Sequence, residues 1–251
     1  MSEPLFYSER LAEPGATLAL TGDEARHAAA SRRLRIGDTL WLFDGQGGIA
    51  RATVLNIATA ARALDLRIEE RRIEPAPQPM IHLACALPKG DRQSTLLDMA
   101  VQLGMTQFTP LECERSVVKP GKGGAARWRR ICLESCKQSR RTHLPVLYPP
   151  AGPGEVVNHA IRRGGTVWMA HPSAQAIPLA SALSQTASVD VTILVGPEGG
   201  FTEKEVHQAT GAGAGLLELE SAILRIETAA VALIAAFALA AGTTRVKQDG
   251  A

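Results

Sequence analysis

A glycine-rich loop follows an apolar run at residues 193–202, which read Ile-Leu-Val-Gly-Pro-Glu-Gly-Gly-Phe-Thr. Glycine adopts backbone conformations that other residues avoid and lets a ligand approach the main chain closely, so this loop favours a pocket for a small polar ligand. A tight turn without a ligand would need one glycine rather than three around Pro197 and Glu198. The Lys-Ser/Thr ending of a phosphate-binding loop is absent, which excludes that class.

Arg225 and Glu227 stand between two apolar runs in a second segment, residues 219–229. An unpaired charge among apolar side chains is costly, so each residue should pair with the other, with a neighbour or with a ligand. Because the segment begins at a predicted strand end, a site role is favoured over purely structural pairing.

The elements that must position these residues follow a strand and helix alternation. Short apolar runs typical of strands alternate with stretches whose apolar residues recur at helical spacing. A capping box at Thr202 and Glu205 begins a helix directly after the glycine loop. The pattern predicts an α/β domain with a parallel sheet, whose strands are expected at residues 80–87, 108–111, 166–170, 191–195 and 216–219. The glycines at 211–215 precede a strand, the reverse of a dinucleotide fingerprint, and indicate a helix end.

A different pattern comes first in the chain. Residues 39–43 and 50–55 flank the turn sequence Asp-Gly-Gln-Gly-Gly, which is typical of a β-hairpin. Three prolines at alternate positions in residues 74–79 then favour an extended connection. The sequence therefore predicts a small β-barrel, a boundary near residue 75 and the α/β domain.

The closing helix, expected at residues 228–241, is apolar on every side. It must be buried in the core of its own domain or against another subunit, and the sequence leaves both alternatives open. The run is shorter than the roughly 20 residues that cross a bilayer, and no secretory signal precedes it, so a cytoplasmic protein is expected.

Charge is informative only locally, because the formal net charge is +2. Residues 112–147 contain nine Lys or Arg against three acids, a balance of +6, and Arg32, Arg33 and Arg35 form a second cluster. Both clusters predict contact with RNA phosphates, although a solvated basic surface is the alternative. Four cysteines without CxxC spacing and six scattered histidines predict free thiols and no metal site.

The chain resembles a known family at the glycine loop and at Ile-Leu-Arg-Ile-Glu-Thr-Ala, residues 223–229. Together they are similar to the RsmE family of 16S ribosomal RNA uridine-N3 methyltransferases, within the SPOUT superfamily. Further similar motifs cover nearly the whole chain, at residues 34–38, 89–92, 103–104, 109–111, 115–118, 127–128, 138–142 and 170–172.

The resemblance implies a PUA-like β-barrel that binds RNA, residues 1–74, followed by a SPOUT-type α/β methyltransferase domain with a trefoil knot, residues 80–245. It also implies a homodimer that uses S-adenosylmethionine to methylate N3 of a uridine in 16S ribosomal RNA of the small ribosomal subunit. Neither a membrane nor a metal is implied.

Carried over position by position, the resemblance places the cofactor against Ala170, His171, Pro172, Gly196, Pro197, Glu198, Gly199, Gly200, Leu219, Ile223 and Leu224. The family usually has glycine and arginine where this chain has Glu220 and Ala222. These departures leave open an alternative in which the fold is kept as a non-catalytic ribosomal RNA-binding assembly factor. Methylation of a different RNA is the second alternative.

Methyl transfer from a sulfonium needs alignment of donor and acceptor, and no covalent protein nucleophile. The imino nitrogen of uridine is protonated at neutral pH, so its proton must be removed or the resulting anion stabilised. We assign Arg225 to stabilise the base, Glu227 to position Arg225, and Glu198 as a less favoured proton acceptor. The RNA-contacting residues are expected to be Arg32, Arg33, Arg35, Lys89, Arg92, Arg115, Arg140 and Arg141.

Overall fold

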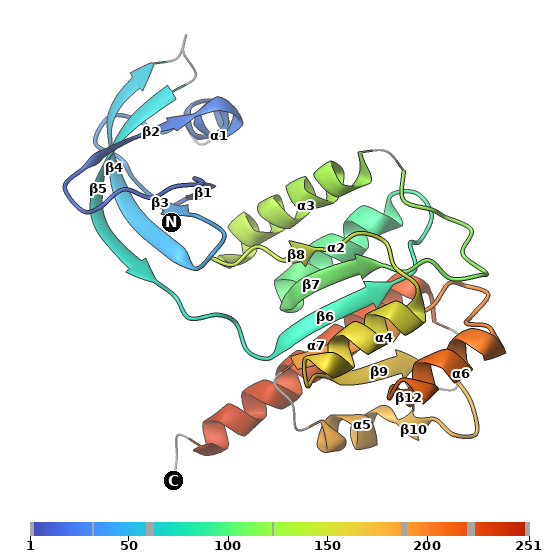
Figure 1. The fold of residues 1–251 in the computed structure, drawn as a ribbon. Helices are drawn as coiled ribbons and strands as arrows, with labels where there is room; N and C mark the ends of the chain where they lie inside the picture. The colour runs from blue at the N-terminus through green and yellow to red at the C-terminus, as the bar shows by residue number, and fades with distance from the viewer. Residues whose placement is uncertain are drawn as a thin grey trace. The chain divides into compact units, whose positions relative to one another are not determined.

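Residues 39–43 pair antiparallel with residues 49–53, which confirms the hairpin that the sequence predicts, and residues 48–58 pair in turn with residues 63–73 (Figure 1). The computed structural model describes residues 3–31, 33–58, 63–121, 123–186, 190–219 and 224–248. By its internal contacts the chain divides into two compact units, Met1–Ala76 with Leu133–Leu144, and Pro77–Cys132 with Pro145–Ala251. The sequence-based division placed Leu133–Leu144 in the second domain, whereas the internal contacts place this segment in the first unit.

The first unit is built on a five-stranded curled sheet with the order β1-β3-β4-β5-β2. Its core is formed by inward-facing apolar residues, among them Phe6, Leu40 and Leu66. The prediction of a small PUA-like β-structure is confirmed. Its elements are β1 (Leu5–Tyr7), β2 (Thr17–Thr21), α1 (Gly22–Arg26), η1 (His27–Ser31), β3 (Thr39–Phe43), β4 (Gly48–Ala58) and β5 (Ala63–Ile73).

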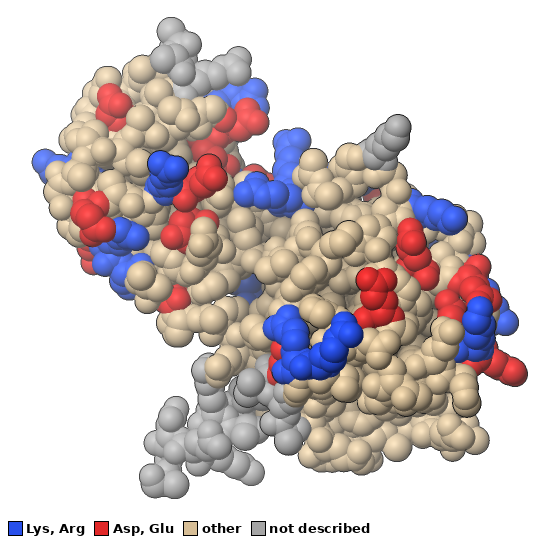
Figure 2. Space-filling model, viewed as in Figure 1, with Lys and Arg blue, Asp and Glu red and all other residues tan. Residues whose placement is uncertain are grey.

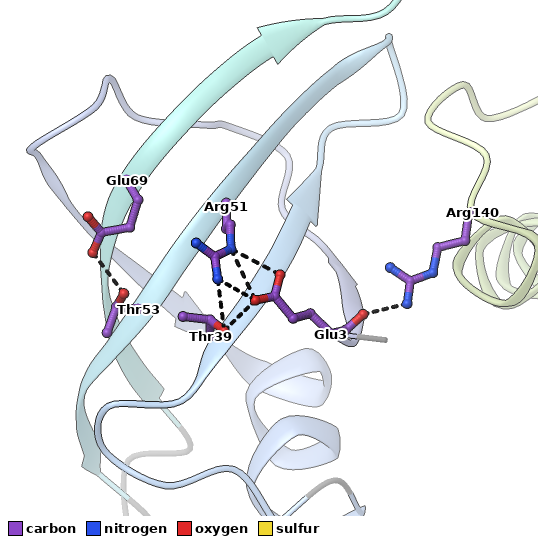
Figure 3. Close-up of polar contacts among 6 residues, drawn as sticks. All are labelled: Glu3, Thr39, Arg51, Thr53, Glu69 and Arg140. Carbon is purple, nitrogen blue, oxygen red and sulfur yellow. Dashed lines mark hydrogen bonds and ion pairs between the residues drawn. The ribbon is translucent and has the colours of Figure 1, made fainter. Parts of the chain in front are cut away.

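Polar contacts fasten the start of the chain to this sheet (Figure 3). The Glu3 carboxylate accepts hydrogen bonds from Arg51 on β4 and from the hydroxyl of Thr39 on β3. These partners, with Arg51 first, lower the pKa of Glu3 to about 2. Arg140, in the segment Leu133–Leu144, donates to the Glu3 carbonyl oxygen. Glu3 therefore joins β3, β4 and the segment Leu133–Leu144.

The second unit contains a seven-stranded sheet with the order β10-β12-β9-β11-β6-β7-β8, and every strand pair in it is parallel. The predicted α/β domain is confirmed. The strands are β6 (Met80–Cys85), β7 (Met105–Pro110), β8 (Val146–Leu147), β9 (Thr166–Ala170), β10 (Ile177–Pro178), β11 (Asp190–Val195) and β12 (Gly215–Glu218).

Helices cover both faces of this sheet, with α4 in front and α7 behind in Figure 1. They are α2 (Arg92–Leu103), α4 (Pro153–Arg162), α5 (Leu179–Gln185), α6 (Glu203–Gly211) and α7 (Ile226–Gln248). A further helix, α3 (Gly124–Ser139), begins in this unit and ends in the segment Leu133–Leu144 of the first unit. The capping box at Thr202 and Glu205 is present at the start of α6. The trefoil knot that the resemblance implies for the C-terminal part of this domain stays a prediction.

The closing helix α7 is longer than predicted and buries one face. Ile226, Ala230, Leu233, Ile234 and Phe237 recur at helical spacing and are at most 3% exposed, while α7 packs on α2, β6 and β11. The opposite face carries partly exposed apolar residues, and Leu239 is 72% exposed. Core burial therefore explains one face of the helix and leaves the other unexplained.

Two sequence expectations concern metals and membranes. All four cysteines are free and buried, as predicted. Among the described residues, no three His, Cys, Asp or Glu side chains gather as they would around a metal ion. No described helix is long and apolar enough to cross a bilayer.

Candidate functional site

Three strand ends meet at one cavity of the second unit. Strands β12, β9 and β11 are neighbours in the parallel sheet, so their carboxyl ends lie side by side. The cavity there has a volume of about 340 Å³, within the range of small-molecule sites. It is lined by Ala170, His171, Pro172, Val195, Gly196, Pro197, Glu198, Gly199, Gly200, Phe201, Leu217, Glu218, Leu219, Leu224, Ile226 and Ala229.

The structure therefore brings together ten of the eleven residues to which the sequence assigned cofactor contact. The eleventh, Ile223, lies outside the described residues, as do the family departures Glu220 and Ala222. The sequence missed Val195, Phe201, Leu217, Glu218, Ile226 and Ala229. Val195, Leu217 and Glu218 are the last residues of their strands or adjoin them, so strand ends alone could have identified them.

Local packing explains the glycines of the loop. A Cβ atom on Gly196 would lie 2.9 Å from the ring of Phe201, which is too close for a side chain. Gly200 has a φ of +69°, in the left-handed region that favours glycine. These two positions let the main chain curl over Phe201 and border the cavity.

The loop is held from its outer side by Arg115. Its guanidinium donates to the carbonyl oxygen of Gly199 at 2.8 Å and of Phe201 at 3.5 Å. Glu205 adds a second link, because its carboxylate accepts from the main-chain nitrogens of Thr202 and Glu114. Arg115, which the sequence assigned to RNA, thus contacts the glycine loop.

Arg92 lies between the two candidate catalytic carboxylates. Its Nη1 is 3.4 Å from Oε1 of Glu227, and its Nη2 is 3.6 Å from Oε1 of Glu198. Of the three pairings that the sequence allowed for Glu227, the one with a neighbour is therefore present. Arg225, whose positioning the sequence assigned to Glu227, is exposed at the start of α7 beside the lining residues Leu224 and Ile226.

The titratable groups that line the cavity are two carboxylates and one imidazole. Burial lowers the pKa of His171 below its usual value, so the ring is neutral at pH 7. Glu198 and Glu218 are exposed, and the described lining residues include no Lys or Arg, although Arg92 pairs with Glu198 from outside the cavity. The walls therefore favour a ligand that carries positive charge.

Cys85, a buried thiol near the site, cannot act as a nucleophile at neutral pH. Burial, together with Cys113, Glu227 and Glu198, raises the pKa of its thiol. Its Sγ donates to the Ala86 carbonyl oxygen at 3.1 Å. The site is accordingly one for binding and alignment.

The basic segment 112–147 makes many internal contacts. Besides Arg115 and Arg140, Arg127 pairs with Asp91, and Lys137 is buried between Glu24 and Glu134. Arg141 is half-buried, and burial lowers its pKa. On the face drawn in Figure 2, acidic and basic side chains are interspersed in each unit. A count of nine cations therefore overstates the charge available to phosphates.

The remaining residues assigned to RNA have varied surroundings. Arg33, Arg35 and Lys89 are exposed, and the Arg35 main-chain nitrogen donates to Asp38 at 2.7 Å. Arg32 lies outside the described residues.

Comparisons with known proteins decide the family. Residues 74–238 match an RNA methyltransferase domain, and residues 20–60 match an RNA methyltransferase PUA domain. Ribosomal RNA small subunit methyltransferase E of Mycobacterium tuberculosis is 32% identical over 240 residues, which cover 92% of this chain and 90% of that protein. The chain belongs to the RsmE family.

Solved structures agree with this membership. Ribosomal RNA small subunit methyltransferase E from Neisseria gonorrhoeae, solved bound to S-adenosyl methionine, is 30% identical with a TM-score of 0.82 and covers 94% of this chain and 96% of that chain. A Legionella pneumophila methyltransferase solved with bound SAM is 28% identical with a TM-score of 0.84, covering 96% and 98%. Like its relatives, this RsmE-family chain combines a PUA-like sheet with a SPOUT-like parallel sheet.

Proposed function

We propose that this chain transfers a methyl group from S-adenosylmethionine to N3 of a uridine in 16S ribosomal RNA of the small ribosomal subunit. The observation that carries the proposal is the cavity at the carboxyl ends of β9, β11 and β12, bordered by the glycine loop. In an RsmE-family chain, this is where a methyl donor and a base can be held together.

The residues present fit the cofactor. Apolar side chains such as Leu217, Leu219 and Ile226 line a space suited to an adenosine group, and the loop main chain offers polar groups. Glu198, Glu218 and a neutral His171 suit the positive charge of a sulfonium.

The chain's own residues have to align the base and manage its proton. S-adenosylmethionine, when bound, supplies the methyl group and a good leaving group. Arg225, exposed beside the cavity, can stabilise the negative charge that develops on the uridine. Glu198 lines the cavity and is the candidate proton acceptor. Glu227 pairs with Arg92.

RNA contact is proposed for the PUA-like domain, residues 1–74, and for exposed cations at the edge of the methyltransferase domain, residues 80–245. Arg33, Arg35 and Lys89 are the strongest candidates because they are exposed. Arg92, Arg115 and Arg140 make contacts within the protein, so their contribution to phosphate binding should be smaller.

We also propose a homodimer through the outer face of α7. That face carries Val231, Ala232, Ala235, Ala236, Ala238 and Leu239, an apolar strip that one subunit does not fully cover. Light scattering at micromolar concentration should give twice the mass of the chain, and a stable monomer would contradict this interface.

The methylation proposal is tested with small ribosomal subunits and S-adenosylmethionine labelled in its methyl group. Digestion to nucleosides and chromatography should recover the label in 3-methyluridine. Label in another nucleoside would overturn the proposed target. Cofactor-dependent thermal stabilisation without any RNA label would instead support a binding protein that has lost catalysis.

A further inference from the structure

Arg92 lies outside the cavity yet touches two of its supports. Glu198 belongs to the glycine loop, and Glu227 belongs to the first turn of α7, so the guanidinium links two segments that each contribute lining residues. Arginine suits this place, because its planar fork can pair with two carboxylates at once.

Glu227 depends on this contact. It is 9% exposed, its Oε1 faces Arg92, and its Oε2 is buried without a hydrogen-bond partner among the described residues. A buried carboxylate that loses its cation must move toward water, take up a proton or remain unpaired at high cost. Any of these changes would disturb the first turn of α7, where Ile226 and Ala229 line the cavity.

Glu198 depends on Arg92 less strongly, because its side chain is 45% exposed and the separation is 3.6 Å. Even so, this contact biases a cavity-lining carboxylate toward the α7 side. The Arg92 side chain is itself only 34% exposed, which limits how fully it could pair with an RNA phosphate.

We propose that Arg92 is a positioning residue, which sets cofactor affinity by holding Glu198 and the Glu227 turn of α7 in place. It acts through these carboxylates and not through an RNA phosphate. The inference rests on the proposed function, because it assumes that the cavity binds S-adenosylmethionine.

Calorimetric titration with S-adenosylmethionine, in the absence of RNA, tests this role on the full chain. Arg92→Ala should weaken binding about tenfold, because it leaves Glu227 buried and unpaired. Arg127→Ala is the matched control, since Arg127 pairs with Asp91 at the start of the same helix at 3.6 Å and does not line the cavity. It should leave cofactor affinity within about twofold of the original.

A second substitution separates positioning from simple loss of stability. In the double variant Arg92→Ala/Glu227→Gln no buried charge is left unpaired, so about half of the lost binding free energy should return. A merely structural role predicts a lower melting temperature in Arg92→Ala with unchanged cofactor affinity, which would overturn the proposal.

A phosphate role has its own signature. Unchanged cofactor affinity in Arg92→Ala, with weaker RNA binding whose salt slope falls by about one, would also overturn the proposal. Should that variant not fold, Arg92→Gln, which removes the charge and keeps a long side chain, replaces it, and cofactor affinity equal to that of the original chain contradicts the inference. Failure of the unaltered chain to bind S-adenosylmethionine would reject the proposed function itself.

Discussion

The cavity of the second unit and the Glu3 network of the first unit use arginine in two ways. At the cavity, Arg115 and Arg92 lie behind the lining and hold the loop that borders the ligand space. In the first unit, Arg51 and Arg140 join the start of the chain to strands and a helix end. Arginine therefore supports the lining of the candidate site in one unit and fastens the start of the chain in the other.

The largest expected effect comes from filling the space beneath the glycine loop. Gly196→Val would place atoms against the Phe201 ring, where even a Cβ lies at 2.9 Å, and so push the loop into the cavity. S-adenosylmethionine affinity should fall about 100-fold, as overpacking by up to about 3 kcal/mol allows. Calorimetry checks this, and Gly154→Ala, which meets nothing closer than 3.9 Å, is the control.

Arg115→Ala should weaken cofactor binding about fivefold, because it removes a charge-assisted hydrogen bond to Gly199 that is partly exposed to water. Titration of this variant beside Arg140→Ala compares two arginines that each donate to a carbonyl oxygen. Equal losses in both would erase the distinction between the two regions.

Acid should weaken cofactor binding through His171. Its folded pKa lies below the usual 6.5, so the ring stays neutral at pH 7 and gains a charge only as the pH falls below that value. A positive ring beside the cavity repels a sulfonium, so affinity should drop severalfold as the pH falls from 7 through the lowered pKa of His171. His171→Gln should flatten this dependence, and an equally steep profile in that variant would exclude the imidazole.

Arg140→Ala should leave cofactor affinity unchanged and lower the free energy of unfolding by about 1 kcal/mol, the usual contribution of one hydrogen bond. Chemical denaturation followed by circular dichroism measures the change. A larger effect on cofactor binding than on stability would be inconsistent with a fastening role.

The smallest effect is expected at Glu3. Its folded pKa of about 2 lies below the usual 4.5, so its contribution is present above pH 4.5 and is lost as the pH falls toward 2. Glu3→Gln should therefore slightly lower the melting temperature at pH 7 and have no effect near pH 2. A difference that persists in acid would mean that the contacts do not depend on the charge.

Local sequence patterns predicted the elements and the glycine loop, whereas the other predicted cofactor contacts came from the family resemblance. Strand ends at Ala170, Val195 and Glu218 converge because a parallel sheet places its carboxyl ends on one edge. The Thr202 capping box could also be predicted, because its partner Glu205 is only three residues away.

Contacts between distant segments could not be read in this way. Arg92 meets Glu227 across 135 positions, and no local spacing encodes that pairing. Counting cations likewise assigned Arg115 and Lys137 to RNA, although the folded chain places one on the Gly199 carbonyl and the other between two glutamates. Charge composition predicts a partner only after internal pairs are known.

Ribosomal RNA from cells that lack this gene tests the central claim most directly. Mass spectrometry of nucleosides from the small-subunit RNA should show that 3-methyluridine is lost, is restored by the original chain and is not restored by Gly196→Val. Unchanged 3-methyluridine in the deleted strain, or full restoration by Gly196→Val, would contradict methylation at this cavity.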